Sequence, residues 1–296
     1  MTSPDAYPDL LPPLPAGIRP SRSNDEIAQF EVEHPNLPKS PAQCITCSGE
    51  KTFRWYKNEP YDSEIIDYAC PCNDQFIAHR EFLRCGVELR YQRQTWSDLH
   101  TVDAHRDEVL SDYLDNYRKY LHAGVGLILT GEPGTGKSML TALILKKMIG
   151  RGIGCRMVGV PKLINEYTNQ WNRTGSVNAQ QKFDREFRMT GILAIDDLSR
   201  EWRSSSSTDK NSRSLGEAAL EDVLRARTQA CLPTIISTNK STSELHEAYP
   251  SHVMNVLEEC SFVVNFTGDN GRPAMMSRTA TETKIGITRP IFYFES

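Results

Sequence analysis

A glycine-rich stretch in the middle of the chain carries residues whose types and spacing suit phosphate chemistry. Residues 131–138 read Gly-Glu-Pro-Gly-Thr-Gly-Lys-Ser and fit the phosphate-loop pattern G-x-x-x-x-G-K-[ST]. Glycines let backbone N–H groups surround a dense negative charge, and a following helix adds a partial positive charge at its N-terminus. The pattern predicts bound ATP, with Lys137 on the β- and γ-phosphates and Ser138 as a Mg²⁺ ligand. The expected nucleotide contacts are Gly131, Glu132, Pro133, Gly134, Thr135, Gly136, Lys137, Ser138 and Met139.

Two further strand ends supply polar groups of the kind that a nucleotide hydrolase needs. The run 192–197, Ile-Leu-Ala-Ile-Asp-Asp, is an apolar strand that ends in two carboxylates. We expect Asp196 to hold the Mg²⁺ through water, and Asp197 to orient or deprotonate the attacking water. The run 234–239, Thr-Ile-Ile-Ser-Thr-Asn, ends in an amide that could read the γ-phosphate. The predicted catalytic residues are Lys137, Asp196, Asp197 and Asn239.

Strands and helices alternate around these motifs. Leu127 to Leu129 form a short apolar run before the loop, and apolar residues at helical spacing follow it as far as Gly150 or Gly152. A second strand is expected at 155–160, with Pro161 at the start of the next helix. Helices and strands continue to alternate as far as residue 266. The alternation predicts an α/β fold, with a parallel sheet covered by helices on both faces.

Composition limits the class of protein. The chain has 296 residues, of which 39% are hydrophobic and 24% charged, so it can bury a sizeable core. No stretch reaches the ~20 apolar residues of a membrane span, and the N-terminus lacks the order of a signal peptide, so we expect a cytoplasmic protein without membrane contact. The net charge of −4 means that any nucleic-acid contact must come from local patches.

Cysteines are concentrated ahead of the phosphate loop. Cys44, Cys47, Cys70 and Cys72 form a Cys-x-x-Cys pair and a Cys-x-Cys pair, which predicts a tetrahedral Zn²⁺ site in a small domain. An iron–sulfur cluster or free thiols are alternatives, and His79 and Cys85 are alternative ligands. The remaining cysteines, which lie in or beside apolar runs, are expected in the core; they are Cys155, Cys231 and Cys260.

Three other segments have two interpretations each. The proline-rich residues 1–40 predict either a mobile tail or a segment that orders on a partner. Between residues 76 and 121 we expect helix, link and helix. The cluster of Arg84, Arg90 and Arg93 with Tyr91 and Trp96 could contact nucleic acid or be a solvated linker. The polar run 169–188, with Trp171, Phe183 and Phe187, could face single-stranded nucleic acid or form a solvated helix pair.

The order of these motifs resembles a known family. Two cysteine pairs precede Arg-Cys-Gly-Val-Glu-Leu-Arg-Tyr at 84–91, then come GEPGTGKS, ILAIDDLS and PTIISTN. The chain is similar to bacterial and phage helicase-loader ATPases of the DnaC/DnaI type and to the IstB transposition helpers, over residues 40–272. The resemblance implies an AAA+ P-loop domain preceded by a zinc-binding domain. The expected division is a tail at 1–40, a zinc domain at 41–85, a linker and helix at 86–121, the AAA+ ATPase domain at 122–280 and a tail at 281–296.

The resemblance also implies partners and further site residues. Such loaders assemble head to tail in a ring or spiral, and they use ATP to place a hexameric DnaB-type replicative helicase on single-stranded DNA. The zinc-bearing region binds the helicase. Asn239 matches the family's sensor asparagine, and Arg272 its second sensor. There are two alternatives to a helicase loader. One is an IstB-like helper that binds DNA and recruits a transposase, and the other is a nucleotide-binding protein without useful turnover.

One departure from the family concerns the trans-acting arginine finger. The family usually carries it in the helix before the last strand, but here that helix reads Ser-His-Val-Met-Asn-Val-Leu-Glu. Arg225 and Arg227, in the helix before the 234–239 strand, are the nearest substitutes, and weak hydrolysis is the alternative. The oligomer size and the identity of the helicase do not follow from the sequence.

Overall fold

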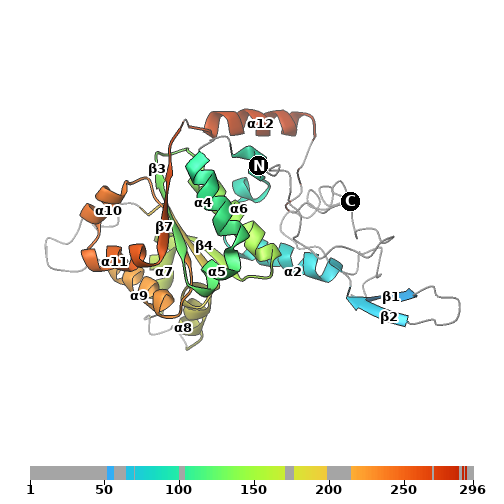
Figure 1. The fold of residues 1–296 in the computed structure, drawn as a ribbon, viewed down its shortest axis with the longest axis horizontal. Helices are drawn as coiled ribbons and strands as arrows, with labels where there is room; N and C mark the ends of the chain where they lie inside the picture. Colours follow the sequence, from blue (N-terminus) through green and yellow to red (C-terminus); the bar gives the residue numbers. More distant parts are fainter. Residues whose placement is uncertain are drawn as a thin grey trace.

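A computed structural model describes residues 52–56, 65–69, 71–99, 104–170, 177–198, 215–268, 270–286, 289 and 291 (Figure 1). Side chains are described from Ile77 onward, except those of residues 104, 105, 177 and 178. Its centre is a five-stranded sheet in the order β4-β5-β6-β3-β7, and every pairing within it is parallel. The parallel sheet expected from the alternation of strands and helices is thereby confirmed. The strands are β3 (Gly126–Gly131), β4 (Cys155–Gly159), β5 (Ile192–Asp196), β6 (Thr234–Ser237) and β7 (Ser261–Phe266).

Helices cover both faces of this sheet. Successive side chains of a strand point to opposite faces, so a single strand packs against helices on both sides. Leu127 and Leu129 belong to one hydrophobic cluster, whereas Ile128 between them belongs to the other. The first cluster is covered by α2 (Pro71–Arg84), α4 (Ala104–Asp115), α5 (Tyr117–His122) and α6 (Lys137–Gly150). The second is covered by α7 (Val160–Asn169), α8 (Val177–Phe183), the π-helical turn η3 (Asp184–Arg188), α9 (Leu215–Gln229), α10 (Thr242–Ala248) and α11 (Ser251–Glu259).

Local signals place the helix ends as expected. The helix after the phosphate loop ends at Gly150, and α7 begins at Val160 with Pro161 in its first turn. Residues before the loop also pack on the sheet, since Phe82 of α2 and Tyr113 of α4 are fully buried. Three further elements lie near the phosphate loop in the described part: α3 (Leu89–Gln92), the 3₁₀ turn η2 (Trp96–Asp98) and α12 (Arg272–Lys284).

The predicted zinc domain falls largely outside the described residues. Cys44, Cys47 and Cys70 are not described, and nothing is described of the Cys72 side chain. An antiparallel hairpin, β1 (Thr52–Tyr56) with β2 (Ile65–Ala69), lies between the two cysteine pairs in the sequence. Within the described residues, no three His, Cys, Asp or Glu side chains gather as a metal site. The zinc site therefore stays a prediction.

Several sequence interpretations prove wrong. Phe183 and Phe187 are 2% and 0% exposed and pack on each other in the second cluster, so neither can stack on a nucleic-acid base. Their spacing of four residues follows the inner face of a helix. Cys231 is exposed, not part of the core, and lies in a turn after α9 with a left-handed φ of 51°.

In the part of the chain that the structure describes, no helix is long and apolar enough to cross a membrane.

Candidate active site

A cavity of about 200 Å³ opens at the carboxyl edge of the sheet, where the phosphate loop and the ends of β5 and β6 meet α3, η2 and α12. Carboxyl ends of parallel strands are the usual place for a ligand in such a fold. The cavity brings together most of the predicted site residues. Its lining is Glu88, Arg90, Tyr91, Asp98, Leu99, Gly134, Thr135, Gly136, Lys137, Ser138, Met139, Asp196, Asp197, Ser237, Asn239, Gly271, Arg272 and Met275.

The phosphate loop depends on glycine for its shape. Gly131 has a φ of 133°, and a Cβ there would lie 2.2 Å from the Phe266 carbonyl oxygen. Gly136 precedes α6 with a φ of 98°, so the loop turns directly into the helix N-terminus. Gly131, Glu132 and Pro133 belong to the loop but are not among the residues that line the cavity. The loop therefore presents its backbone and the start of α6 to the same space, as phosphate binding requires.

Lys137 is held at the centre of the loop. Its Nζ donates to the carbonyl oxygens of Gly131 at 2.6 Å and Glu132 at 2.7 Å. Burial lowers the pKa of this ammonium, and the charges of Asp197 and Glu132 oppose that effect. An ammonium carries three donor protons, and the third contact of Nζ, to Thr135 Oγ1, is long at 3.4 Å, so a phosphate oxygen can take its place.

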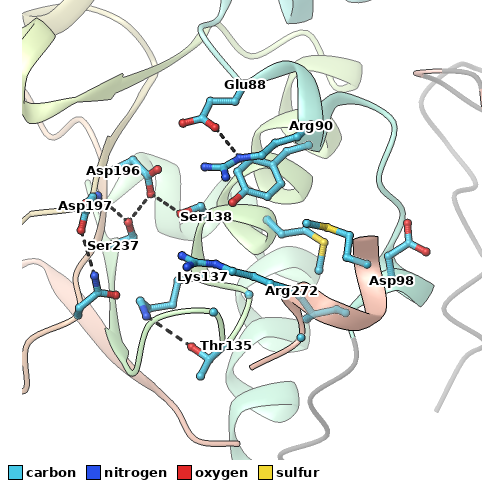
Figure 2. A pocket seen from close by; sticks show the side chains of 18 residues that line it. Glu88, Arg90, Asp98, Thr135, Lys137, Ser138, Asp196, Asp197, Ser237 and Arg272 are labelled. Atoms are coloured by element: carbon cyan, nitrogen blue, oxygen red, sulfur yellow. Dashed lines mark hydrogen bonds and ion pairs between the residues drawn. The ribbon is translucent and has the colours of Figure 1, made fainter. Parts of the chain in front are cut away.

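Ser138 and Asp196 are adjacent, as a shared Mg²⁺ requires. Ser138 Oγ donates to Asp196 Oδ1 at 2.9 Å, although the two residues are 58 positions apart in the sequence. The Ser237 hydroxyl donates to the same oxygen (Figure 2). Burial raises the pKa of the Asp196 carboxyl, and the two hydroxyl contacts lower it. This pair of oxygen ligands fits Mg²⁺, which prefers carboxylate, hydroxyl and water.

Asp197 and Asn239 form the next pair along the sheet edge. Asn239 Nδ2 donates to Asp197 Oδ1 at 3.2 Å, and the Asp197 N–H donates to Ser237 Oγ at 3.0 Å. Asp197 has a left-handed φ of 56°, a conformation that costs a non-glycine residue roughly 1 kcal/mol or more and often marks a functional position. Figure 2 shows Asp196 and Asp197 on the same side of the cavity, opposite Arg272.

Arg272 reaches the cavity from the other side. It is the first residue of α12, and Figure 2 shows its side chain extending across the cavity toward Lys137 and Ser138. The preceding residue anchors the helix on the phosphate loop, because the Gly271 N–H donates to the Gly134 carbonyl oxygen at 3.1 Å. Met139 lines the cavity beside Met275, so the side near α12 is partly apolar.

Several lining residues were missed or misread from the sequence. Arg90 and Tyr91 were expected to contact nucleic acid or to belong to a solvated linker, but Tyr91 is 9% exposed and both line the cavity. The sequence did point to this segment in part, because residues 84–91 are one of the stretches on which the family resemblance rests. Glu88 lies in the same segment and Ser237 in the run 234–239, although neither was predicted as a site residue. Asp98, Leu99 and Met275 had no local signal.

The two arginines considered as trans fingers are in different surroundings. Arg227 is 0% exposed, and its guanidinium donates to the carbonyl oxygens of Thr190 at 2.8 Å and Pro233 at 2.6 Å. It therefore holds α9 to the strand ends and cannot reach another copy. Arg225 is half exposed and pairs with Glu221 at 2.7 Å. Glu221 also contacts His252 of α11, the helix in which the family places its finger.

Comparisons with known proteins agree with this geometry. Residues 127–258 match the family model "ATPase family associated with various cellular activities (AAA)". No curated protein matches the chain.

Three solved structures illustrate what this chain is similar to. The "DnaC helicase loader" has a TM-score of 0.50 and 20% identity, covering 61% of this chain and 100% of that one. "DnaI" has a TM-score of 0.48 and 20% identity, covering 63% and 95%. Domain III of the Thermotoga maritima replication initiation protein DnaA has a TM-score of 0.49 and 14% identity, covering 68% and 77%. At these identities the likeness concerns the fold alone. Together with the family match, the geometry identifies residues 127–258 as an ATPase domain of the AAA type.

Proposed function

We propose that the chain is an ATP-dependent loader that places a ring-shaped replicative helicase on single-stranded DNA. The supporting observation is the position of the segment 84–91. This segment is one of the stretches on which the resemblance to helicase loaders rests, and Glu88, Arg90 and Tyr91 within it line the nucleotide cavity. The likeness therefore extends beyond the phosphate loop, which very many ATPases share.

The described site supports a division of labour in hydrolysis. Lys137 would hold the β- and γ-phosphates, and Arg272 would reach the same phosphates from α12. Ser138 and Asp196 would hold Mg²⁺, which supplies charge neutralisation on the triphosphate when it is bound. Asp197, fixed by Asn239, would accept a proton from the attacking water. Each role uses a side chain that lines the cavity.

Self-association would complete the site with a cation from a second copy. Arg225 is the suitable residue, because it is half exposed and Glu221 places it beside α11. Its removal should lower hydrolysis without changing nucleotide affinity, whereas substitution of the buried Arg227 should unfold the domain. Light scattering in ATP and in ADP tests whether the oligomer depends on the triphosphate.

Helicase binding is the decisive test of the proposal. The N-terminal residues 41–85, with their cysteine pairs, are the proposed docking region for a hexameric helicase. We expect a pull-down with the replicative helicase of the same cell to succeed with the full chain and to fail with Cys70→Ser, which removes one predicted zinc ligand. Metal analysis of both proteins would show whether zinc is lost in parallel.

Hydrolysis with and without single-stranded DNA provides a second test. A loader should release phosphate at a rate that DNA changes. If the wild-type chain does not bind the helicase, the loader proposal is wrong. Filaments on duplex DNA would then support the transposition helper, and nucleotide binding without turnover would support a nucleotide-dependent interaction protein.

A further inference from the structure

Helix α12 lies across the top of the molecule (Figure 1) and borders the cavity, yet none of its residues is buried. Its half-buried residues are Met275, Arg278 and Glu282, which are three and four positions apart and so share one face of the helix. Only one of the three is apolar. Hydrophobic packing therefore contributes little to holding α12, and another attachment must keep it over the cavity.

Asp98 supplies that attachment. Its carboxylate is only 3% exposed, although it lies beside the cavity. Arg289 Nη1 donates to both of its oxygens, at 3.0 and 2.9 Å, and Arg278 Nη1 donates to Oδ1. The Thr95 N–H donates to Oδ2 at 2.8 Å. These four contacts use the whole acceptor capacity of a carboxylate, and charge-assisted bonds of this kind are the strong ones.

The network continues from Asp98 to the helix that begins at the phosphate loop. Arg278 Nη2 donates to Gln94 Oε1 at 2.7 Å. The Gln94 carbonyl oxygen accepts from Lys146 Nζ at 3.0 Å, and Lys146 is a buried residue of α6. We call Gln94, Asp98, Arg278 and Arg289 the Asp98 latch. It joins α6, the segment before the phosphate loop and the C-terminal part of the chain.

The other end of α12 is fixed on the phosphate loop by the contact between Gly271 and Gly134. The helix is thus held at its start by one backbone hydrogen bond and along its length by the latch. Between these two attachments, Arg272 and Met275 face the cavity. A nucleotide that leaves on this side has to pass both side chains, and a movement of α12 would carry both of them away together.

We propose that Asp98 is a positioning residue that holds α12 closed over the nucleotide and so sets the rate at which nucleotide leaves. The inference rests on the nucleotide site but not on helicase loading. It assigns Asp98 no contact with the reacting phosphate. The consequence is a specific kinetic pattern: loss of the latch should raise the dissociation rate and KM more than it lowers kcat.

The test compares Asp98→Asn with Glu186→Gln in the full chain. Glu186 pairs with Arg156 at 2.8 Å, with both side chains about one-fifth exposed, and neither lines the cavity. The control therefore breaks a partly buried carboxylate–arginine pair elsewhere in the same domain. The dissociation rate of fluorescently labelled ADP is measured by stopped flow. We expect about a tenfold rise for Asp98→Asn, the effect of one charge-assisted hydrogen bond, and no change for Glu186→Gln.

A purely structural role for Asp98 predicts a different result. Both variants would then lower the melting temperature, and the dissociation rate would stay at the wild-type value in each. That result would overturn the proposal. Hydrogen exchange provides an independent readout, because opening of the latch should speed exchange of the α12 amides in Asp98→Asn and not in Glu186→Gln.

Arg278→Ala keeps the proposal testable if Asp98→Asn does not fold. It removes one cation that is about one-quarter exposed, and Arg289 still neutralises Asp98. We expect a rise of about threefold in the dissociation rate. The variant loses the contacts of Arg278 to Asp98 and Gln94, but Arg289 keeps its bonds to Asp98 and its ion pair with Glu282 of α12. An unchanged rate in this variant also counts against the proposal. Failure of the nucleotide site itself would be recognised separately, by labelled ADP that does not bind the wild-type chain.

Discussion

The nucleotide cavity has two walls that are held in different ways. One wall, here called the floor, consists of residues 131–138 with the ends of β5 and β6, and it is fixed by backbone geometry and a parallel sheet. The other wall, the roof, consists of α3, η2 and α12. Tyr91 and Trp96 pack with the hydrophobic core, whereas α12 is attached mainly by ion pairs such as those of Asp98. A wall that is fixed by backbone geometry keeps one conformation, whereas a helix that is attached by ion pairs can move away at a modest cost in free energy. The difference suggests that the floor does the chemistry and the roof controls access.

Loss of Lys137 should have the largest effect on the floor. Lys137→Ala removes the ammonium that the loop carbonyls hold next to the phosphate position. We expect nucleotide affinity to fall by about two orders of magnitude or more, because a charge-assisted contact in a partly buried site is lost. Isothermal titration with ATP measures the change. Lys147→Ala, on the same helix but not lining the cavity, serves as the control and should bind normally. Equal affinity in both variants would place the nucleotide elsewhere.

Asp196→Asn should affect hydrolysis more than binding. The amide keeps the contacts to Ser138 and Ser237 but loses the negative charge that attracts Mg²⁺. We expect phosphate release to fall about 100-fold, with ATP binding unchanged in the presence of EDTA. The wild type should show a related pH effect. Burial raises the pKa of the Asp196 carboxyl. As the solution is acidified, activity should therefore begin to fall at a higher pH than it would with an aspartate of ordinary pKa. If Asp196→Asn kept full activity, Asp196 would not be a ligand of the metal ion.

The floor could be predicted from the sequence because its information is local. Lys137 and Ser138 stand at fixed positions in one short motif, and Asp196 follows an apolar strand directly. The roof could not be predicted in this way. Asp98 meets Arg278 and Arg289, which are 180 and 191 positions away, and no periodic pattern links such residues. Their proximity follows only from the path of the chain over the folded sheet.

Two misread residues had a signal that periodicity could have revealed. Arg227 lies three residues after Leu224 and seven after Leu220, on the buried face of α9, so its burial agrees with helical spacing. Phe187 lies four residues after Phe183, and both are buried for the same reason. For the two phenylalanines a polar sequence context outweighed the spacing, and Arg227 was considered as the nearest substitute for the missing finger arginine. The domain boundaries proposed from the sequence stay predictions, as do the roles of the site residues.

Gly131→Ala tests whether the floor depends on backbone shape. The added Cβ would lie 2.2 Å from the Phe266 carbonyl oxygen in β7, and the φ of 133° is unfavourable for alanine. We expect a loss of about 2–4 kcal/mol in the free energy of unfolding, since a strand must shift. Gly152→Ala is the matched control, because its φ of 80° is also positive but nothing lies within 4 Å. It should cost about 1 kcal/mol from the backbone alone. Similar melting temperatures for the two variants would mean that the floor is more adaptable than the sheet register implies.

Arg90→Ala should have the smallest effect, and it tests the electrostatics of the roof. Arg90 Nε lies 2.6 Å from Glu88 Oε2 and its guanidinium lies 4.7 Å above the Tyr91 ring centroid, with both charged side chains about half exposed. Such an exposed pair contributes at most about 1 kcal/mol, so removing Arg90 should leave the melting temperature nearly unchanged. It also removes one positive charge beside the phosphates, and we expect ATP affinity to fall by about threefold at low salt, with a smaller change at high salt. Arg80→Ala breaks a similar arginine–glutamate pair, with Glu81, that does not line the cavity, and it should leave ATP affinity unchanged. If Arg90→Ala lowered kcat by two orders of magnitude instead, the roof would take part in the chemistry, and its contrast with the floor would no longer hold.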